Sequence, residues 1–481
     1  MFGLQTIDIA VIVIYSLAIV VIGVVAMLRI KNQEDYFLGG RRFGKLLHIF
    51  STFGQATSSD TAVGTVTTTY RNGAGGVWSA LLLLWATPFY WFTAPWYRRM
   101  RLLTFGDFFR ERYNSRAMAM LYSVMASFLL VATIGLGFKA MSVTVIGITL
   151  KQESALTAAE LAERAQAVRL DGLGAQSARA PLAPAEQAEL DRLRDLKPRH
   201  EFSAINETWL VWFLVAVIFL YGCLGGLEAA VWVDMLQGML ILVLSVLLLP
   251  FSIARLNTLS GGAGLHDAFT ALHQRLPGHF FEVFGSAANS DFTWYFVIAA
   301  SVMATLNVAV QANQFTSNAA ARNEFTARVG STAGNYLKRV CTVLWGVTGL
   351  FAFALYHDSV RDPDLVWGHA TRDLLGGLGF GLVGLMIACL FSALQSTAST
   401  HMISAAGLFT RNVYEPLFPG RGERHYLMVG RVMSAAESAG AALLCTAFAT
   451  ILDMLKFLWE FNAVIAAAFW CGIKWRGATR A

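Results

Sequence analysis

Charged residues are scarce in this chain of 481 residues: Asp, Glu, Lys and Arg make up 14% of it, whereas hydrophobic residues make up 56%. A soluble domain usually carries about a quarter charged residues. The deficit excludes an ordinary soluble fold, because most of the side chains would have no favourable contact with water. We therefore expect a polytopic membrane protein whose helix lengths follow the thickness of the bilayer.

Motifs that would mark an enzyme or an ATP-driven pump are missing as well. No phosphate-binding loop is present, and the five cysteines lack the spacing of a metal knuckle or a disulfide framework. No nucleophile and base converge in the sequence, so we expect no enzyme activity. The formal charge of +6 lies in short loops between apolar runs, which favours a membrane topology over a nucleic-acid partner.

Apolar runs of about 20 residues, the length that crosses a bilayer, recur along the chain. The first, from about Ile7 to Leu28, is too long for a signal-peptide core and lacks a small-residue cleavage site, so we expect a retained helix. The sequence predicts an all-α fold of about eleven spans in one transmembrane domain over residues 1–481. These spans are 6–29, 46–70, 76–97, 118–150, 207–224, 227–255, 292–316, 330–357, 376–410, 424–451 and 454–473.

Lys and Arg residues concentrate in alternate loops, which places those loops in the cytoplasm. The basic loops are 29–45, 98–116, 317–339, 411–424 and the C-terminal end. We therefore expect an N-terminus outside and a multi-pass protein of the inner (plasma) membrane.

Two segments are predicted to lie outside the membrane. The insertion 151–202 is expected to form a solvated helical hairpin. Its first helix would start near Ser154, Thr157 and Glu160, and its second would end at about Leu196. An extracellular lid or a docking surface is the alternative for this insertion. The aromatic, partly apolar segment 262–286 predicts a helix at the membrane interface.

Three spans carry polar groups at membrane depth, where such groups are costly and tend to be functional. The second span reads Ser51 to Gly64 with Asp60 among hydroxyl and amide side chains, which indicates a broken helix around a binding site. The alternative is a polar face packed on other helices. In the ninth span, Ser392, Ser396 and Thr400 share one helix face with Ser399 beside them. Hydroxyl and carbonyl oxygens suit a sodium ion.

Two ionisable residues at membrane depth leave their roles open. Asp234 follows the pair Gly225-Gly226 on a long span and would bind a cation or a proton, unless it pairs with a neighbouring helix. Lys139 in the fourth span would bind an anionic substrate group, or else neutralise Asp60 or Asp234.

These segments, in this order, resemble the sodium:solute symporter family, which includes sodium/galactose, sodium/proline and sialic acid symporters. The stretches that carry the resemblance include Gly225 to Gln237 and Ser396-Thr397. Four others match: Asp35 to Arg41, Thr104 to Phe109, Asn313-Gln314, and Leu408 to Asn412. The resemblance implies a LeuT-like fold of two inverted five-helix repeats, over about 46–255 and 292–473, with the first span as a peripheral extra helix. Family members usually add further helices after this core, and this chain ends at Ala481.

Carried over by position, the resemblance implies a first sodium site and a second one. The first would use the carbonyls of Gly54, Thr57 and Ala393 with the hydroxyls of Ser396 and Thr397. The second would use Asp234, Ser399 and Thr400.

Departures from the family patterns leave the solute open. Ala309 and Val310 stand where galactose symporters have Tyr-Trp, and Ala56 stands where proline symporters have an aspartate. We expect a small polar solute, a sugar, an amino acid or a carboxylate. Its candidate contacts are Gln55, Ser58, Asp60, Thr61 and Lys139.

The expected function is sodium-coupled symport by alternating access. A proton-coupled carrier and a membrane sensor of the same fold are the alternatives.

Overall fold

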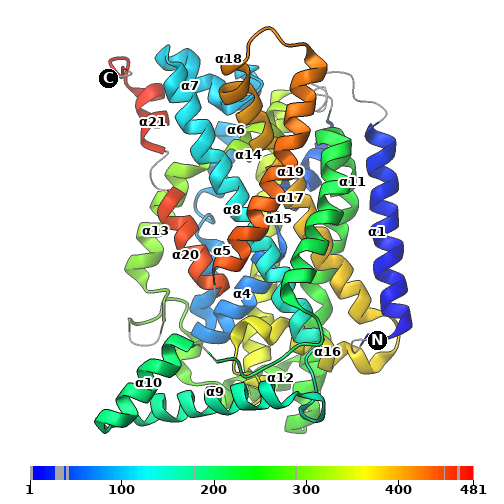
Figure 1. Ribbon diagram of the computed structural model, residues 1–481, viewed down its shortest axis with the longest axis vertical. Helices are drawn as coiled ribbons and strands as arrows, with labels where there is room; N and C mark the ends of the chain where they lie inside the picture. The colour runs from blue at the N-terminus through cyan, green and yellow to red at the C-terminus, as the bar shows by residue number, and fades with distance from the viewer. Residues whose placement is uncertain are drawn as a thin grey trace.

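The computed structural model describes residues 4–27, 37–38, 43–177, 180–196, 198–287, 290–448, 450–462 and 466–479. Every named element in these ranges is a helix, and their β pairing is limited to isolated bridges such as that between Phe43 and Ala321. The first helix begins at one end of the molecule, and the last helix ends at the opposite end (Figure 1). We call the end that carries the 151–202 insertion the insertion end, and the opposite end, with the basic loops, the basic end.

The first half of the chain contains one broken pass and one irregular pass before its long helices. The predicted second span is divided at residues 56–58, and the predicted third span is a series of short helices rather than one. The elements are α1 Thr6–Met27, α3 Lys45–Gln55, α4 Ser59–Asn72, η2 Gly73–Val77, α5 Trp78–Leu81, η3 Thr87–Phe89, α6 Tyr90–Met100, α7 Phe105–Tyr113, α8 Arg116–Ile148, η4 Glu153–Ala155, α9 Ala158–Ser177, α10 Pro184–Leu196 and α11 Glu207–Ser260.

The second half again opens on a broken pass, because α13 and α14 meet at a 45° bend. The predicted eleventh span contains α20 and α21, and residues 463–465 between them lie outside the described residues. The elements are α12 Gly264–Arg275, η5 Gly278–Phe281, α13 Trp294–Asn307, η6 Val308–Val310, α14 Ala312–Ala319, α15 Glu324–Tyr356, η7 Pro363–Leu365, α16 Val366–Leu375, η8 Gly376–Leu378, α17 Leu382–Phe409, the π-helix η9 Thr410–Tyr414, α18 Glu415–Leu417, α19 Glu423–Ala447, α20 Ile451–Asn462 and α21 Ala466–Lys474.

The spans predicted at 207–224 and 227–255 form one helical element, α11, of 54 residues. A straight helix of that length would measure about 80 Å. The hairpin that precedes α11 and the helix α12 that follows it both lie at the insertion end (Figure 1). The element therefore reverses direction, and its two limbs make the two passes that the sequence predicts.

By length and composition alone, five helices in the described ranges can cross a membrane, and the bent α13–α14 pair would make a sixth. The sequence predicts about eleven spans. The difference arises in part because breaks shorten some of them: the α3–α4 pass and the α5–α6 pass are each divided.

The helix α1 lies at the edge of the molecule (Figure 1), as the resemblance implies, and exposes Ile14, Leu17 and Val21. It packs against both α11 and α17. Near its start, the Asp8 carboxylate accepts the backbone N–H of Gly384 at 2.9 Å. Any side chain at Gly384 would overlap the backbone of Asp8, so glycine is what permits this close contact.

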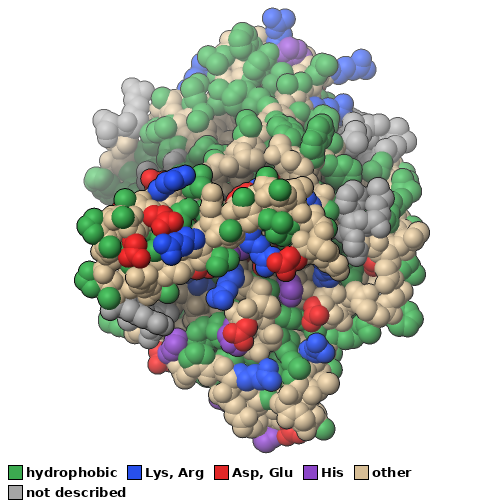
Figure 2. Space-filling view, turned by 60° about the horizontal axis from the view of Figure 1, so that its bottom comes forward, with side chains coloured by type: hydrophobic (Ala, Val, Ile, Leu, Met, Phe, Trp, Pro, Cys, Tyr) green, Lys and Arg blue, Asp and Glu red, His purple; other side chains and the backbone are tan. Residues whose placement is uncertain are grey.

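The insertion forms the predicted helical hairpin, α9 and α10, which lies at the insertion end with α1's first turn (Figure 1). Its predicted start is confirmed as a capping box. The Glu160 carboxylate accepts the Thr157 N–H at 2.8 Å, and the Thr157 hydroxyl accepts the Glu160 N–H at 3.3 Å. Basic and acidic side chains are interspersed over this end (Figure 2), as expected of a solvated surface. The helix predicted within 262–286 is present as α12.

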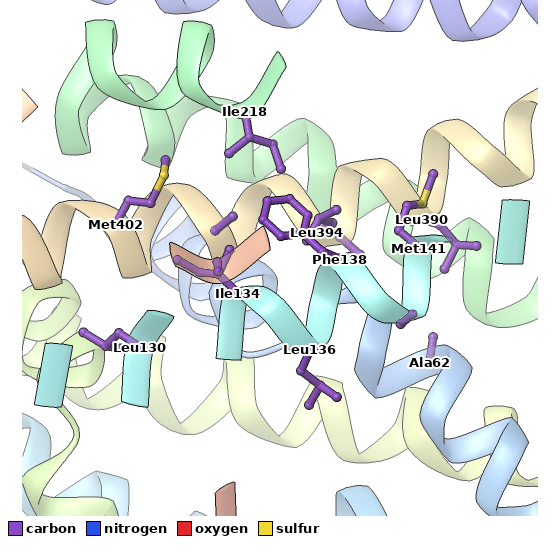
Figure 3. Close-up of a cluster of buried hydrophobic side chains, with 14 of the residues drawn as sticks. Ala62, Leu130, Ile134, Leu136, Phe138, Met141, Ile218, Leu390, Leu394 and Met402 are labelled. Atoms are coloured by element: carbon purple, nitrogen blue, oxygen red, sulfur yellow. The ribbon is translucent and has the colours of Figure 1, made fainter. Parts of the chain in front are cut away.

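The apolar core lies between α8 and α17. Side chains of α8, α17, α4 and the first limb of α11 meet there (Figure 3). Phe138 and Leu394 are fully buried at its centre. The same two long helices carry the polar groups described next, so this core fixes the frame of the candidate site.

Candidate functional site

The helix break predicted in the second span lies after Gln55. Helix α3 ends there, Ser58 is extended with φ −90° and ψ 172°, and α4 begins at Ser59. The run of Ser, Thr and Gly weakens helix propensity locally, because hydroxyl side chains compete for backbone hydrogen bonds and glycine adds conformational freedom. The break leaves carbonyl groups near the middle of the molecule free to face other helices.

Asp234 on α11 lies directly against this break and against α17. Its carboxylate accepts hydrogen bonds from the hydroxyls of Ser396, at 2.5 Å, and Ser51, at 2.8 Å. Asp234 and Ser396 are fully buried, and Ser51 is nearly so. One carboxylate and two hydroxyls from three helices therefore converge inside the molecule.

Thr397 joins α17 to the same break. Its hydroxyl lies 3.3 Å from the Gly54 carbonyl oxygen and 3.2 Å from that of Gln55. A side chain at Gly54 would overlap the Ser396 hydroxyl, so only glycine lets α3 and α17 approach this closely. Of the five groups of the predicted first sodium site, the structure brings Gly54, Ser396 and Thr397 together.

Thr57 and Ala393, the other two members, are both fully buried. The Thr57 hydroxyl has no hydrogen-bond partner within the described part of the chain. A buried oxygen without a partner is costly unless something else coordinates it. Neutral oxygens with one carboxylate nearby form a donor set that fits a small monovalent cation.

No direct hydrogen bond joins Asp234 to the other two members of the predicted second sodium site, Ser399 and Thr400. Asp234 bonds to Ser51 and Ser396 rather than to Ser399 or Thr400. The Ser399 hydroxyl donates to the carbonyl of Ser396 at 3.2 Å, and the buried Thr400 hydroxyl has no partner among the described residues. Asp234 points to the first group of oxygens because α11 crosses α17 at Ser396.

Two adjoining cavities open on the other side of the break. The inner cavity, of about 210 Å³, is lined by Gln55, Ser58, Asp60 and Thr61, four of the five predicted solute contacts. The outer cavity, of about 460 Å³, shares Asp60 and Thr61 with it. Both side-chain polar atoms of Gln55 and one carboxylate oxygen of Asp60 are buried without a partner in the described ranges. These groups can therefore accept a ligand.

Lys139, the fifth predicted solute contact, lies elsewhere. Its ammonium pairs with Glu207 at 3.1 Å, and it lines neither cavity. It does not neutralise Asp60 or Asp234 by a direct contact either. The sequence could not show this, because Glu207 follows the insertion and comes close to Lys139 only through the fold.

Lys338 and Arg339 of α15 line both cavities, and the sequence analysis missed them as site residues. The Lys338 ammonium donates to the Ala56 carbonyl at the helix break. Both residues had been counted with the basic loop 317–339. The helix α15 begins at Glu324, so they lie about four turns inside it. Two adjacent basic residues beyond a helix start are the feature that could have revealed them.

A second polar network that the sequence did not reveal joins α1 to the site helices. The Tyr15 hydroxyl donates to Gln395 at 2.7 Å and accepts from Gln237 at 3.1 Å. Gln395 precedes Ser396, and Gln237 lies about one helical turn after Asp234. The first helix therefore contacts the residues next to the carboxylate and hydroxyl described above.

The stretches that carry the family resemblance also meet in space. Asn412 of η9 donates to the Thr104 hydroxyl at 2.8 Å, and Arg411 lies 3.5 Å from Asp107. Asn313 and Gln314 line the inner cavity. The stretch Asp35 to Arg41 lies outside the described residues except for Phe37 and Leu38, which are buried.

The model of the sodium:solute symporter family matches residues 36–150 and 201–481 of this chain. The chain belongs to the sodium:solute symporter family. The match omits residues 151–200, so the hairpin α9–α10 is an addition to the part that the family shares.

Curated relatives agree with this family membership. Sodium/myo-inositol cotransporter 2 of Sus scrofa is 28% identical over 248 residues, which cover 46% of this chain and 36% of that protein. Sodium/glucose cotransporter 4 of Danio rerio is 23% identical over 90% of this chain and 61% of its own length. Sodium/sialic acid symporter NanT of Aliivibrio fischeri is 21% identical over 94% of this chain and 78% of its own length. The alignments to the first two relatives therefore span less than two thirds of their length.

A solved structure confirms the fold. The substrate-bound, outward-open state of a Na⁺-coupled sialic acid symporter superposes with a TM-score of 0.70, over 98% of this chain and 87% of that one, at 15% identity. This member of the sodium:solute symporter family therefore has the LeuT-like helical fold that the sequence predicts, with broken passes α3–α4 and α13–α14.

Proposed function

We propose that this sodium:solute symporter is a secondary-active carrier that couples the entry of a small polar organic solute to the entry of sodium. The observation that carries the proposal is the convergence of Asp234, Ser396 and Thr397 on the break after α3. In carriers with broken helices, freed carbonyls and half-helix ends bind the ion and the solute near the middle of the membrane.

The sodium ion is proposed to lie between α3, α11 and α17. Its ligands would be the carbonyls of Gly54, Thr57 and Ala393 and the hydroxyls of Ser396 and Thr397. The Asp234 carboxylate supplies the negative charge that offsets the ion's charge at a buried position. Ser399 and Thr400 lie on the next turn of α17 and would serve a second ion.

The solute is proposed to occupy the inner cavity, in contact with Gln55, Ser58, Asp60 and Thr61. Its expected class is a sugar, an amino acid or a carboxylate, and the protein is a carrier rather than an enzyme. Sodium would favour one conformation because it binds that conformation more tightly, and the solute would be released when the other conformation opens. The single transporter domain would lie in the plasma membrane with its N-terminus and the insertion outside.

The test is the thermal stability of the purified protein in sodium against potassium at matched ionic strength. A ligand that binds only the folded state raises stability by RT ln(1 + [L]/Kd), so ~100 mM sodium on a millimolar site adds roughly 2–3 kcal/mol. The shift should disappear when Ser396→Ala and Thr397→Ala are combined. Ser252→Ala is the matched control, since that buried hydroxyl bonds only to the Leu248 carbonyl of its own helix.

The absence of a sodium-selective shift in the unaltered protein would contradict the proposal. Uptake that follows a proton gradient and ignores sodium would instead assign the protein to proton-coupled carriers.

A further inference from the structure

The two cavities contain an excess of positive charge. Lys338 and Arg339 line both of them, and Asp60 is the acidic residue in either lining. No acidic oxygen in the described part of the chain lies within 4.0 Å of either basic side chain. Two positive groups and one negative group leave the chamber with one uncompensated positive charge.

Arg339 is the least satisfied of these groups. It is 4% exposed, its Nε donates to the Thr87 hydroxyl at 3.3 Å, and its Nη1 donates to the Ala80 carbonyl at 2.9 Å. Its Nη2 has no partner among the described residues. Two neutral acceptors thus hold the guanidinium in place and leave Nη2 free to bind a ligand.

A guanidinium stays charged in proteins, and a buried charge without a counterion is strongly unfavourable. Intramembrane basic residues are retained at such a cost where they bind an ion or a substrate. The planar fork of Arg matches a carboxylate better than it matches a neutral hydroxyl group. The free Nη2 of Arg339 therefore favours an anionic oxygen.

Lys338 and Asp60 do not remove this preference. The Lys338 ammonium already donates to the Ala56 carbonyl, which holds it at the helix break. Asp60 is the nearest compensating charge for Lys338, and one such carboxylate can neutralise only one of the two basic groups. A monoanion restores the balance.

The outer cavity indicates the rest of the ligand. Part of it is lined by apolar side chains of α13 and α20, among them Phe296, Met303, Leu458 and Trp459, and another part by the uncharged polar residues Thr61, Thr65, Ser79, Thr133, Asn307 and Gln311. Its volume of about 460 Å³ falls in the range of small-molecule sites. Hydroxyl groups of a solute that face the apolar part would lose water and find no partner there, which is costly, so that part fits an apolar group.

We infer that the transported solute is a small monocarboxylate with an apolar body. Its carboxylate binds the free Nη2 of Arg339 beside Lys338, and its apolar part occupies the apolar side of the outer cavity. This inference rests on the proposed symport function and narrows the substrate class of the same site. It separates this chain from relatives whose names specify glucose, myo-inositol or sialic acid.

The experiment measures ligand-induced thermal shifts and calorimetric binding of the purified full chain in ~100 mM sodium. The probes are phenylacetate, its neutral amide phenylacetamide, zwitterionic phenylalanine and neutral myo-inositol. Phenylacetate should bind, and its amide should bind at least about tenfold more weakly, because the two differ chiefly in the carboxylate charge.

Two variants locate the contact. Arg339→Gln should lose the preference for phenylacetate over phenylacetamide, whereas Arg339→Lys should retain part of it. Ala300→Phe, which fills the outer cavity, should weaken phenylacetate binding without changing the sodium-selective shift. This second variant keeps the test valid if Arg339→Gln does not fold.

Several results would overturn the inference while leaving sodium-coupled symport intact. The first is myo-inositol binding in sodium with no response to phenylacetate. The second is tighter binding of phenylalanine than of phenylacetate, because Asp60 would then bind an ammonium group. The third is an unchanged carboxylate preference in Arg339→Gln. Loss of the sodium-selective shift in the unaltered protein would contradict the proposed function itself, so the two failures are distinguishable.

Discussion

The Ser396 hydroxyl donates to the Asp234 carboxylate across 2.5 Å, and both residues are fully buried. By position in the family pattern, Ser396 is proposed for the first sodium site and Asp234 for the second. Their contact means that one carboxylate can serve both sites, either directly or by orienting the hydroxyl that coordinates the ion. Occupation of one site would then affect the affinity of the other, because both depend on the same charge.

Asp234→Asn tests this shared role. The substitution keeps the size of the side chain but removes the charge, so the sodium concentration for half-maximal stabilisation should rise at least about tenfold, equivalent to ~1.4 kcal/mol. A sodium titration of the thermal midpoint measures it. Ser51→Ala removes the other hydroxyl on the same carboxylate and should have a smaller effect. Equal sodium affinity in Asp234→Asn and the unaltered protein would separate Asp234 from the ion.

Gly54→Ala tests the close approach of α3 and α17. The added methyl group would overlap the Ser396 hydroxyl, so the helices must separate or the hydroxyl must rotate away from Asp234. Overpacking of this kind costs roughly 1–3 kcal/mol, and the sodium-selective shift should be lost with it. Gly172→Ala on α9 is the control, since its new methyl group would meet no neighbour. A sodium shift that survives Gly54→Ala would show that this helix contact is not needed.

The sequence predicted the elements of the site better than their partners. The break after Gln55 followed from a dense run of Ser, Thr and Gly at membrane depth, and the hydroxyl face of α17 followed from helical spacing. The pairing of Lys139 with Glu207 could not be predicted from the sequence, because 67 residues, including the insertion, separate them in the chain. Arg339 was missed because apolar periodicity identifies where a helix crosses the bilayer core but not where its polar first turns begin.

Tyr15→Phe tests whether α1 supports the ion site. Loss of the hydroxyl leaves Gln237 and Gln395 bonded to each other at 3.2 Å but removes two hydrogen bonds, each worth roughly 0.5–1.5 kcal/mol. Because these residues flank Ser396 and Asp234, we also expect a weaker sodium response. Tyr426→Phe is the matched control. It removes a hydroxyl that bonds to the Phe418 carbonyl near the basic end, and should lower stability without changing the sodium response. Equal sodium responses in both variants would assign Tyr15 a purely structural role.

Acidic pH should stabilise the insertion end. Burial, with a smaller contribution from Asp362, raises the pKa of Glu201 to about 7, and burial also raises the pKa of Asp364 to about 7. Between about pH 4.5 and 7, these two carboxyl groups are therefore protonated in the folded state but ionised in the unfolded state. Stability should fall as pH rises through this window, by roughly 1–3 kcal/mol per group. Thermal midpoints from pH 5 to 8 measure it. Glu201→Gln should make the thermal midpoint depend less on pH. Glu111→Gln, at an exposed glutamate of α7, should leave the pH dependence unchanged. A midpoint that is independent of pH would contradict the assignment.

The hairpin α9–α10 should be dispensable for the ion site. It lies outside the region that the family model matches, and its own small core contains Leu173, Leu190 and Leu193. Its two ends meet at its base, where the Lys151 N–H donates to the Phe202 carbonyl at 2.8 Å. A short Gly/Ser linker in place of residues 155–199 can therefore close the gap without moving α8 or α11.

We expect the shortened protein to keep its sodium-selective thermal shift within experimental error. Its solute-free midpoint should change little, because exposed ion pairs such as Arg169 with Glu189 contribute about 0–1 kcal/mol. The control is a Gly/Ser linker in place of α12, a helix that packs on α11 and α15 and whose loss should not be tolerated. An unchanged sodium shift combined with faster solute entry would assign the hairpin as a lid over the outer opening. Loss of the sodium shift would show instead that the hairpin holds the transporting helices in place.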